Sequence, residues 1–303
     1  MNCVVIGYGS IGQRHARILT QLGCRVAVVS RREIPFSPAY RILTDALTRE
    51  KPDYVVIASE TGRHYADFTE LAALGFDGTV LVEKPLFHAP LKIPENRFQN
   101  AYVAYNLRFH PILRRLAEIV KEEPPLCAQV YVGQYLPDWR PGRDYRENYS
   151  ARRSGGGGVL YDLSHEPDYL LRLFGGWKRL AALGGRLGAL NIESDDAYSL
   201  LFAAERCPAV QVHLNYLDRI GRREFTLITE NCSVKADLVL QTLQVNQEIT
   251  PYTLNRDDTY ILQHKAVLNG EHEILCTLHE GLSVLEFIRA AEQAAEQEIW
   301  VMR

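Results

Sequence analysis

Near the start of the 303-residue chain stands Gly7-Tyr8-Gly9-Ser10-Ile11-Gly12, which fits the pattern GxGxxG. The apolar run Val4-Val5-Ile6 precedes it, and apolar residues recur at helical spacing from Ile11 to Leu22. In such a strand–turn–helix the first glycine permits the tight turn, the second lets the backbone approach a pyrophosphate, and the third allows close packing of helix on strand. The helix N-terminus offers free N–H groups to the phosphates. The pattern therefore predicts a dinucleotide-binding turn; the alternative is a plain turn with structural glycines.

The end of the next apolar run indicates which dinucleotide would bind. Residues 25–29 form the second predicted strand, and Ser30-Arg31-Arg32 follows it, with Glu33 one position further. A carboxylate at this place accepts hydrogen bonds from the ribose 2′-OH of NAD, whereas arginines bind the 2′-phosphate of NADP. The sequence therefore predicts NADP in preference to NAD. The alternative is that the arginines are solvated surface charge and that Glu33 reaches the ribose.

The first third of the chain continues as alternating strands and helices. Apolar runs at 54–58, 79–82 and 102–105 predict further strands, and a helix is predicted from about 63 to 74. This alternation implies parallel strands joined by crossover helices, with both faces of the sheet covered. We therefore expect a doubly wound α/β Rossmann domain over residues 1–106, which binds NAD(P) at the carboxyl ends of its strands.

After residue 106 strands follow strands. Helices are predicted near 111–121, 162–174 and 281–297, and the strand candidates are 127–135, 179–187, 197–203, 210–216, 224–228 and 274–277. This order predicts a C-terminal α+β domain over residues 107–303, with a large mainly antiparallel sheet.

Bulk properties argue against several classes of partner. The formal net charge of −3 gives no reason to expect nucleic acid or a membrane surface. No apolar stretch approaches the ~20 residues of a membrane span, and no leader-like segment precedes the first strand, so we expect a cytoplasmic protein. None of the six cysteines has the CxxC spacing of a zinc or redox motif. We expect buried reduced thiols and no metal.

Three further motifs follow the glycine turn in a specific order. Val82-Glu83-Lys84-Pro85-Leu86 ends the fourth predicted strand, residues 105–111 read YNLRFHP, and residues 157–168 read GGVLYDLSHEPD. Together these motifs resemble the glucose–fructose oxidoreductase and inositol dehydrogenase family (Gfo/Idh/MocA) over nearly the whole chain. The resemblance implies an NAD(P)-dependent dehydrogenase or reductase acting on CH–OH groups, by reversible hydride transfer between a nicotinamide and a sugar-like alcohol or ketone.

The resemblance also implies catalytic roles. Lys84 would lie near the nicotinamide and the reacting hydroxyl, and the proline after it is commonly cis in the family. His165 would be the general acid/base, because an imidazole has a pKa near the operating pH. Asp162 would orient it, but the family commonly spaces these two residues four apart rather than three, so Asp168 stays a second candidate for the partner.

The remaining predicted contacts surround these residues. The segment 87–100 contains two prolines and little periodicity, so we expect a loop where many relatives have a helix. Asn106 and Arg108 are predicted substrate contacts. The predicted cofactor contacts are Gly7, Gly9, Ser10, Ile11, Gly12, Ser30, Arg31, Arg32, Ser59, His64, Glu83 and Lys84.

A loop rich in arginine and aromatic residues follows the first strand of the second domain. Its residues 136–146 read LPDWRPGRDYR. Arginine forks and aromatic faces suit an anionic, ring-containing substrate, such as a sugar acid, a sugar phosphate or a nucleotide sugar. Alternatively, nearby carboxylates neutralise the arginines in a surface network; these are Asp138, Asp144 and Glu147. The predicted substrate contacts in the loop are Trp139, Arg140, Arg143 and Tyr145.

Two other functions fit the same motifs. A family member can use the cofactor transiently to drive elimination or glycoside cleavage, or the chain can be a non-catalytic dinucleotide-binding regulator. The presence of Lys84 together with Asp162 and His165 favours catalysis. The strand at 209–216 has apolar members on both registers, which agrees with burial of both faces. We therefore also expect a homodimer or homotetramer formed through the C-terminal sheet.

Overall fold

The computed structural model describes residues 1–153 and 156–303, and the chain forms two compact units. The first unit comprises Met1–Asn106 and Asp257–Leu285, and the second comprises Leu107–Arg256 and Glu286–Arg303. The sequence also places a boundary after residue 106, but it assigns everything beyond that point to the second domain. The segment 257–285 instead packs with the first unit.

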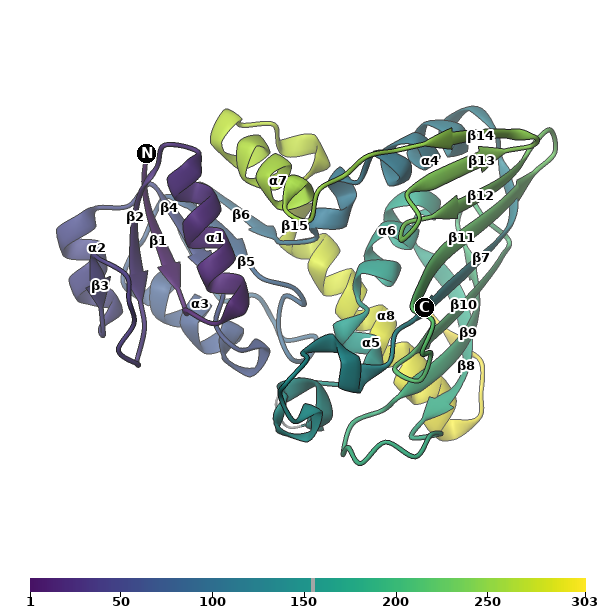
Figure 1. The fold of residues 1–303 in the computed structure, drawn as a ribbon, viewed down its shortest axis with the longest axis horizontal. Helices are drawn as coiled ribbons and strands as arrows, with labels where there is room; N and C mark the ends of the chain where they lie inside the picture. The colour runs from purple at the N-terminus through teal and green to yellow at the C-terminus, as the bar shows by residue number, and fades with distance from the viewer. Residues whose placement is uncertain (154–155) are drawn as a thin grey trace. The chain divides into compact units, whose positions relative to one another are not determined.

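The first unit is built around a seven-stranded sheet (Figure 1). Its order is β15-β6-β5-β4-β1-β2-β3, and every neighbouring pair is parallel except β15 with β6. Helices α1 and α7 lie on one face, and α2 and α3 lie on the other (Figure 1). The bounds are β1 Asn2–Ile6, β2 Arg25–Val29, β3 Ala39–Tyr40, β4 Tyr54–Ile57, β5 Thr79–Val82, β6 Asn100–Val103, β15 Cys276–Thr277, α1 Ser10–Gln21, α2 Leu43–Glu50, α3 His64–Ala73 and α7 Asp258–Asn269.

The central strands of this sheet explain why helices must cover both faces. Every residue of β4 is buried, and β1 and β5 are buried from their second residue onward. Burial of each large aliphatic side chain contributes about 1.5–3 kcal/mol, and a run without polar alternation can gain this only between two layers. The predicted doubly wound Rossmann domain is confirmed.

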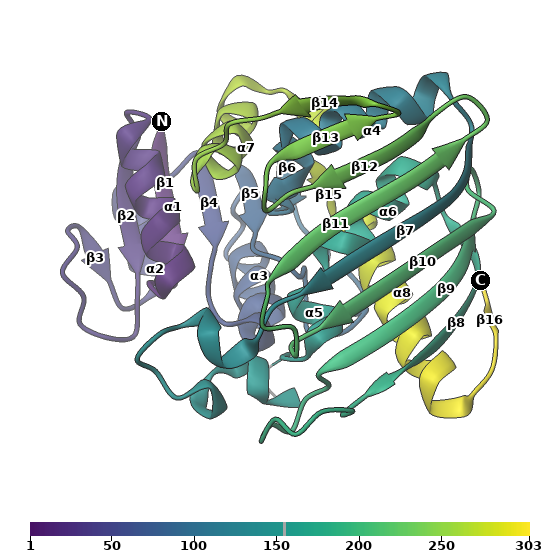
Figure 2. The ribbon, with the colours of Figure 1, turned by 45° about the vertical axis from the view of Figure 1, so that its right-hand side comes forward.

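The second unit contains a nine-stranded sheet in the order β14-β13-β12-β11-β7-β10-β9-β8-β16. Only β7 and β10 pair in parallel, so the predicted mainly antiparallel sheet is confirmed. Helices α4, α5, α6 and the later part of α8 lie against one face (Figure 2). The bounds are β7 Pro125–Gly133, β8 Trp177–Gly185, β9 Ala197–Ala204, β10 Ala209–Asn215, β11 Arg222–Thr229, β12 Ser233–Asp237, β13 Thr242–Val245, β14 Glu248–Pro251, β16 Val301–Met302, α4 Pro111–Glu122, α5 Val159–Asp162, α6 His165–Phe174 and α8 Leu278–Gln297.

Short 3₁₀ helices occupy several connections. They are η1 Thr61–Arg63, η2 Asn106–Phe109, η3 Leu136–Trp139, η4 Tyr145–Glu147, η5 Tyr149–Ala151 and η7 His272–Ile274. The segment 87–100, which was predicted to be a loop, contains no helix. Its last residue is the first of β6. The sequence did not predict α2, α7 or the three strands β12 to β14.

The strand predicted at 274–277 is present as β15, but it belongs to the other sheet. It pairs with β6 of the first unit, where Cys276 lies opposite Val103 and both are buried. Its assignment to the second sheet is wrong, because strand pairing over such a sequence distance leaves no local signal.

The helix predicted from 162 to 174 is two helices. α5 ends at Asp162, and α6 begins at His165. Pro167 has no N–H to donate to the carbonyl of Leu163, so a helix running through this point would lose a hydrogen bond. Asp162 and His165, predicted to lie on one helix, therefore lie on two.

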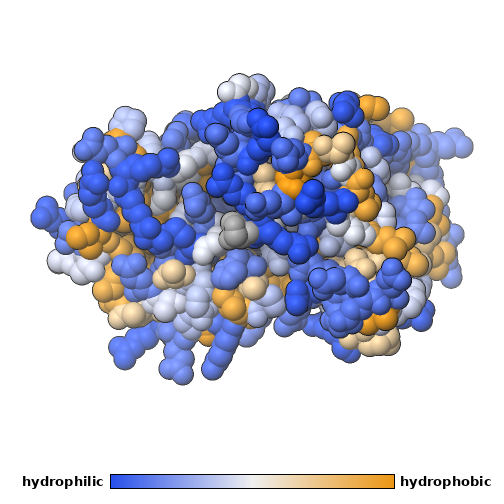
Figure 3. Space-filling view, turned by 90° about the horizontal axis from the view of Figure 1, so that it is seen from below, coloured by the Kyte–Doolittle hydropathy of each residue, from blue (hydrophilic) through white to orange (hydrophobic). Residues whose placement is uncertain are grey.

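The exposed surface is mainly polar. On the face shown in Figure 3, hydrophilic side chains predominate and hydrophobic ones form small separate patches. Among residues 1–153 and 156–303, no helix is both long enough and apolar enough to cross a membrane.

Candidate active site

The register of the first sheet brings the predicted cofactor contacts to one edge. Ile6 lies opposite both Val29 and Ile57, and Ile57 lies opposite Val82, so β1, β2, β4 and β5 end together. In an open α/β sheet, ligands bind at the carboxyl ends of the strands. The segments that follow these four strands are the glycine turn, Ser30 to Arg32, Ser59, and Glu83 with Lys84.

The glycine turn has the geometry that a pyrophosphate requires. Gly7 has a φ of +98°, and a Cβ atom on it would lie 2.5 Å from the carbonyl oxygen of Ala58. A Cβ on Gly12 would lie 2.2 Å from the carbonyl oxygen of Gly7, whereas a Cβ on Gly9 would meet nothing within 4 Å. The first and third glycines are therefore required by the fold, and the second leaves open space at the N-terminus of α1, where Ser10 and Ile11 begin the helix. This arrangement fits a dinucleotide.

The contrast between Gly9 and Gly12 gives a prediction. We expect Gly9→Ala to fold with a loss of about 1 kcal/mol or less, because its φ of −74° suits alanine and only the helix cap is weakened. Its added methyl group would occupy the space needed by the pyrophosphate, so dinucleotide binding should fall at least about 10-fold. Gly12→Ala should lower the melting temperature strongly instead. Calorimetric melting and cofactor titration distinguish the two, and unimpaired binding by Gly9→Ala would contradict the assignment.

Arginines cluster after β2. Arg31 and Arg32 are exposed, and neither guanidinium has a hydrogen bond or ion pair within the part of the chain that the structure describes. Ser30 Oγ accepts a hydrogen bond from the N–H of Arg32 at 3.2 Å, which closes the turn. Glu33 has a side chain that is 94% exposed and pairs with Arg41 at 3.4 Å. Sequence reasoning missed Arg41, because β3 brings it beside the turn.

Ser59 and His64 follow β4 and behave differently. Ser59 Oγ is buried and makes no hydrogen bond to any described residue, so this hydroxyl group is able to hydrogen-bond to a ligand. His64 is fully buried, with Nδ1 3.0 Å from the carbonyl oxygen of Pro85 and Nε2 3.1 Å from that of Ser59. Burial lowers the pKa of His64, although both carbonyl contacts oppose this. His64 thus joins the ends of β4 and β5, which supports a structural role rather than the predicted cofactor contact.

The Glu83-Lys84-Pro85 turn is anchored below the surface. The Lys84–Pro85 peptide is cis, as the family resemblance implied. Glu83 is buried, and its Oε2 accepts a hydrogen bond from the backbone N–H of Lys84 at 3.0 Å. Its Oε1 lies 2.8 Å from Nε2 of His15 in α1. Lys84 is half-buried at the strand end, where it was predicted.

Two predicted substrate contacts are engaged inside their own units. Asn106 donates to Thr259 Oγ1 at 2.7 Å. Arg108 is buried and forms a forked ion pair with Asp168, with N···O distances of 2.6 to 3.1 Å. These contacts favour structural roles for Asn106 and Arg108. Because Asp168 is held by Arg108, Asp162 is the better candidate for orienting His165.

Two tyrosines, Tyr149 and the buried Tyr216, hold Asp162. Tyr216 donates a hydrogen bond to Asp162 Oδ2 at 2.6 Å. The pKa of Tyr149 is raised first by the charge of Asp162, then by burial and by its hydrogen bond to Asp162. His165 begins α6 and is half-buried. Sequence reasoning missed both tyrosines, because they lie on η5 and after β10 rather than in the motif.

The same tyrosines contact the arginine-rich loop. The Trp139 ring packs edge-on against Tyr216, with centroids 5.2 Å apart, and the guanidinium of Arg140 lies 5.8 Å from the Tyr149 ring centroid. Arg140 also donates to the amide oxygen of Asn148 at 3.2 Å. Arg143 is exposed. The loop and Asp162 therefore belong to one cluster of the second unit.

One carboxylate of the loop, that of Asp144, neutralises a different arginine. Asp144 pairs with Arg146, and hydrogen bonds from Arg146 lower the pKa of Asp144 to about 2. Tyr145 accepts a hydrogen bond from the backbone N–H of Asn191 through its hydroxyl at 3.3 Å. Neither Arg140 nor Arg143 forms an ion pair with any described residue. These two guanidinium groups therefore have no carboxylate partner among the described residues.

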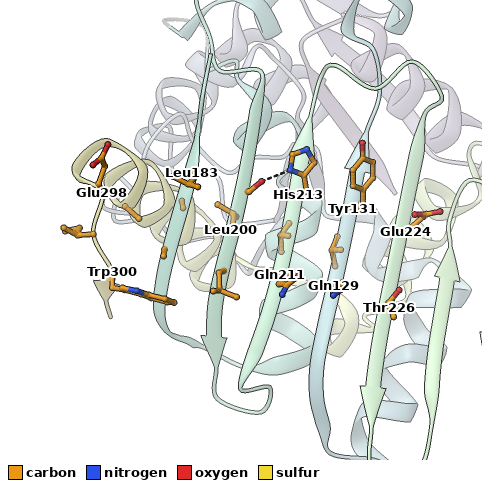
Figure 4. Close-up of a pocket in the computed structure, with 18 residues that line it drawn as sticks. Gln129, Tyr131, Leu183, Leu200, Gln211, His213, Glu224, Thr226, Glu298 and Trp300 are labelled. Atoms are coloured by element: carbon orange, nitrogen blue, oxygen red, sulfur yellow. Dashed lines mark hydrogen bonds between the residues drawn. The ribbon is translucent and has the colours of Figure 1, made fainter. Parts of the chain in front are cut away.

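A separate hollow of about 900 Å³ lies on the other face of the second sheet (Figure 4). Tyr131 and His213 stand on neighbouring strands there, with stacked rings 5.3 Å apart, and Ser199 hydrogen-bonds to His213 at 2.8 Å. Leu183 and Trp300 add exposed apolar surface, with exposed fractions of 73% and 47%. The hollow contains none of the predicted catalytic or cofactor residues.

Buried histidines make stability depend on pH. Burial lowers the pKa of His64, lowers that of His110 to about 4 with help from Arg223, and lowers that of His264 well below its usual range with help from His15. Below pH ~6.5 the histidines of the unfolded chain take up protons, whereas the buried imidazoles of the folded chain stay neutral. The free energy of unfolding therefore falls as the pH falls. Each group contributes up to about 1.4 kcal/mol per pH unit.

We therefore expect a lower melting temperature at pH 5.5 than at pH 7.5, measured by calorimetry. His110→Gln should weaken this dependence, because one of the three groups is removed. Equal melting temperatures at both pH values would contradict the burial of neutral imidazoles.

Comparisons with known proteins agree with the fold. Residues 1–95 match the family model GFO_IDH_MocA, described as an oxidoreductase family with an NAD-binding Rossmann fold. A search of curated protein sequences gave no match. Among solved structures, a levoglucosan dehydrogenase complexed with NADH and L-sorbose superposes with a TM-score of 0.85 at 14% identity, covering 100% of this chain and 98% of the other.

Two further solved structures are similar over their whole length. The WlbA dehydrogenase from Bordetella pertussis, complexed with NADH and UDP-GlcNAcA, has a TM-score of 0.80 at 17% identity, covering 100% of this chain and 97% of the other. GenD2 from gentamicin A biosynthesis, complexed with NAD, has a TM-score of 0.82 at 21% identity, covering 100% and 96%. At these identities the likeness establishes the two-domain fold.

The matched family model and the glycine turn define the class of this protein: it is an NAD(P)-dependent oxidoreductase. More particularly, the matched model over residues 1–95 is that of the Gfo/Idh/MocA oxidoreductases, the family that the motifs of this chain resemble.

Proposed function

We propose that this protein is an NADP-preferring oxidoreductase that transfers hydride between the nicotinamide and a hydroxyl or keto group of an anionic sugar derivative. The observation that carries the proposal is the edge of the first sheet. There the open space above Gly9 and the unneutralised guanidinium groups of Arg31 and Arg32 follow neighbouring strands. Helix N–H groups suit the pyrophosphate, and arginines suit a 2′-phosphate.

The residues of each unit support an acid/base role. When bound, the nicotinamide accepts or supplies the hydride. During alcohol oxidation His165 takes the hydroxyl proton, and Lys84 polarises the reacting oxygen with its ammonium group. Asp162 orients the imidazole, and its carboxylate is itself fixed by Tyr149 and Tyr216. In the reducing direction His165 returns the proton to the oxygen.

An anionic substrate is favoured by the loop of the second unit. Arg140 and Arg143 are not neutralised by the loop carboxylates, and Trp139 offers an aromatic face beside Tyr216. The WlbA structure contains UDP-GlcNAcA, a sugar nucleotide, and the levoglucosan dehydrogenase structure contains L-sorbose. We therefore place sugar acids and nucleotide sugars first among the candidate substrates.

A substrate screen tests this function. Purified protein is incubated with NADP or NADPH and a panel of sugar acids, sugar phosphates and nucleotide sugars, and product mass and absorbance at the nicotinamide band are recorded separately. Product that appears with an equal change in cofactor supports net hydride transfer. Product without net cofactor change would show transient use of the cofactor, and cofactor binding without any product would favour the regulator. The matched control replaces Arg97, an exposed arginine outside the site, by alanine.

The other face of the second sheet supports the predicted homo-oligomer. Residues of β10 alternate between buried and exposed positions within one chain. The exposed residues lie on the same face of the sheet as an apolar patch that includes Leu201. A second copy of this sheet would remove that patch from water. We expect a dimer or tetramer by light scattering at micromolar concentration, and Leu201→Glu should dissociate it. Ile42→Glu in the first unit is the control, and a wild-type monomer would contradict the proposal.

A further inference from the structure

A chain of buried polar residues runs beneath Lys84 in the first unit. Glu83 Oε1 lies 2.8 Å from His15 Nε2, His15 Nδ1 lies 2.7 Å from His264 Nε2, and His264 Nδ1 lies 3.0 Å from the hydroxyl of Tyr54. Both imidazoles and the phenol are fully buried. Glu83 directly follows β5, and the other three residues come from α1, α7 and β4. Figure 1 shows α1 and α7 on the same face of the sheet.

One assignment of donors and acceptors accounts for all three hydrogen bonds that link these four residues. An ionised Glu83 can only accept, so Nε2 of His15 donates to it. His264 then donates from Nε2 to Nδ1 of His15, and Tyr54 donates to Nδ1 of His264. Burial raises the pKa of Glu83, but the hydrogen bond from His15 and the adjacent Lys84 outweigh burial and keep the pKa below its usual value. Burial also raises the pKa of Tyr54, so the phenol keeps its proton to donate.

The end of this chain is the backbone of Lys84. The second oxygen of Glu83 accepts the Lys84 N–H at 3.0 Å, so the orientation of the carboxylate sets the position of the lysine backbone. A buried carboxylate without the His15 donor would have to turn or take up a proton, because an unsatisfied buried charge is costly. His15 also stands one helical turn beyond Gly12, so α1 carries both the phosphate turn and the support for Lys84.

We propose that His15 is a positioning residue for Lys84, acting through the Glu83 carboxylate, and that His264 and Tyr54 hold His15 in the required orientation. This inference rests on the proposed function, in which Lys84 polarises the reacting oxygen. It assigns a role to a histidine that lies outside the motifs of the predicted site. Misplacement of a catalytic group by about 1 Å can lower a rate by roughly 100-fold.

A matched pair of variants separates positioning from core stability. In His15→Gln the side-chain amide nitrogen replaces Nε2, so the donor to Glu83 is kept and the contact with His264 is lost. In His15→Asn the amide group replaces Nδ1, so the contact with His264 is kept and the donor to Glu83 is lost. Each variant removes one buried hydrogen bond, and a merely structural role predicts similar effects. His279→Asn, at an exposed histidine of the same unit, is the control.

We expect His15→Asn to lower kcat by about 10- to 100-fold with little change in the Kd for NADPH, and His15→Gln to stay within about three-fold of wild type. Equal losses of kcat in both variants, or a loss confined to the Kd, would overturn the proposal. Hydrogen–deuterium exchange of the Lys84 amide gives a readout that needs no substrate. If the wild type proves inactive, the proposed function fails, and faster exchange in His15→Asn but not in His15→Gln still supports the positioning role, whereas equal exchange overturns it.

Discussion

Lys84→Ala is expected to lower kcat/KM by about 10²- to 10⁴-fold, the range that a positioned acid/base group typically contributes. The lysine lies at the carboxyl end of β5, on the edge where β1, β2 and β4 also end, and its backbone is anchored to the buried Glu83. The loss should appear mainly in kcat, because the proposed contact forms with the reacting oxygen. Steady-state kinetics with the best substrate of the screen measures it.

The control for this variant is Lys92→Ala, which removes an exposed lysine from the loop at 87–100. Its kinetics should match the wild type. The melting temperature of Lys84→Ala should also stay close to that of the wild type, because the backbone contact with Glu83 does not need the lysine side chain. If Lys84→Ala kept full activity in the oxidoreductase assay, its catalytic role would be refuted.

Arg31→Ala is expected to weaken NADPH binding by about 10- to 100-fold and to leave NADH binding within about three-fold. Arg31 is exposed and has no ion-pair partner among the described residues, so its charge is unneutralised before ligand binding. NADH has no 2′-phosphate, so loss of this charge should matter little to it. The ratio of the two dissociation constants, measured by nicotinamide fluorescence, isolates the contact.

Glu33→Ala tests the competing interpretation, in which Glu33 reaches the ribose of NAD. The carboxylate is almost fully exposed and pairs with Arg41, so its removal should free Arg41 and strengthen NADPH binding if it changes binding at all. A selective loss of NADH binding in Glu33→Ala, with NADPH unaffected in Arg31→Ala, would reverse the cofactor preference.

The parts of the site that could be predicted from the sequence depend on local patterns. The glycine turn is set by spacing within six residues, and Glu83-Lys84-Pro85 directly ends an apolar run. The parallel register brings both to one edge, so the prediction of a parallel sheet was enough to place both motifs at the carboxyl ends of its strands.

The parts that could not be predicted depend on contacts between distant residues. His15 and His264 are 249 positions apart, and Arg108 and Asp168 are 60 positions apart. A single sequence gives no signal for such pairs, because each residue alone is compatible with a solvated or a buried position. For the same reason Asp168 remained a candidate partner of His165 until Arg108 was found to hold it.

We expect the first unit to bind a nicotinamide dinucleotide through the turn at Gly7 to Gly12. Isothermal titration calorimetry of the purified wild type with NADPH, and separately with NADH, tests it most directly. We predict saturable binding of one dinucleotide per chain, tighter for NADPH. Tighter binding of NADH would contradict the role of Arg31 but leave the fold and class intact. No binding of either dinucleotide would contradict the account of this protein as a working oxidoreductase.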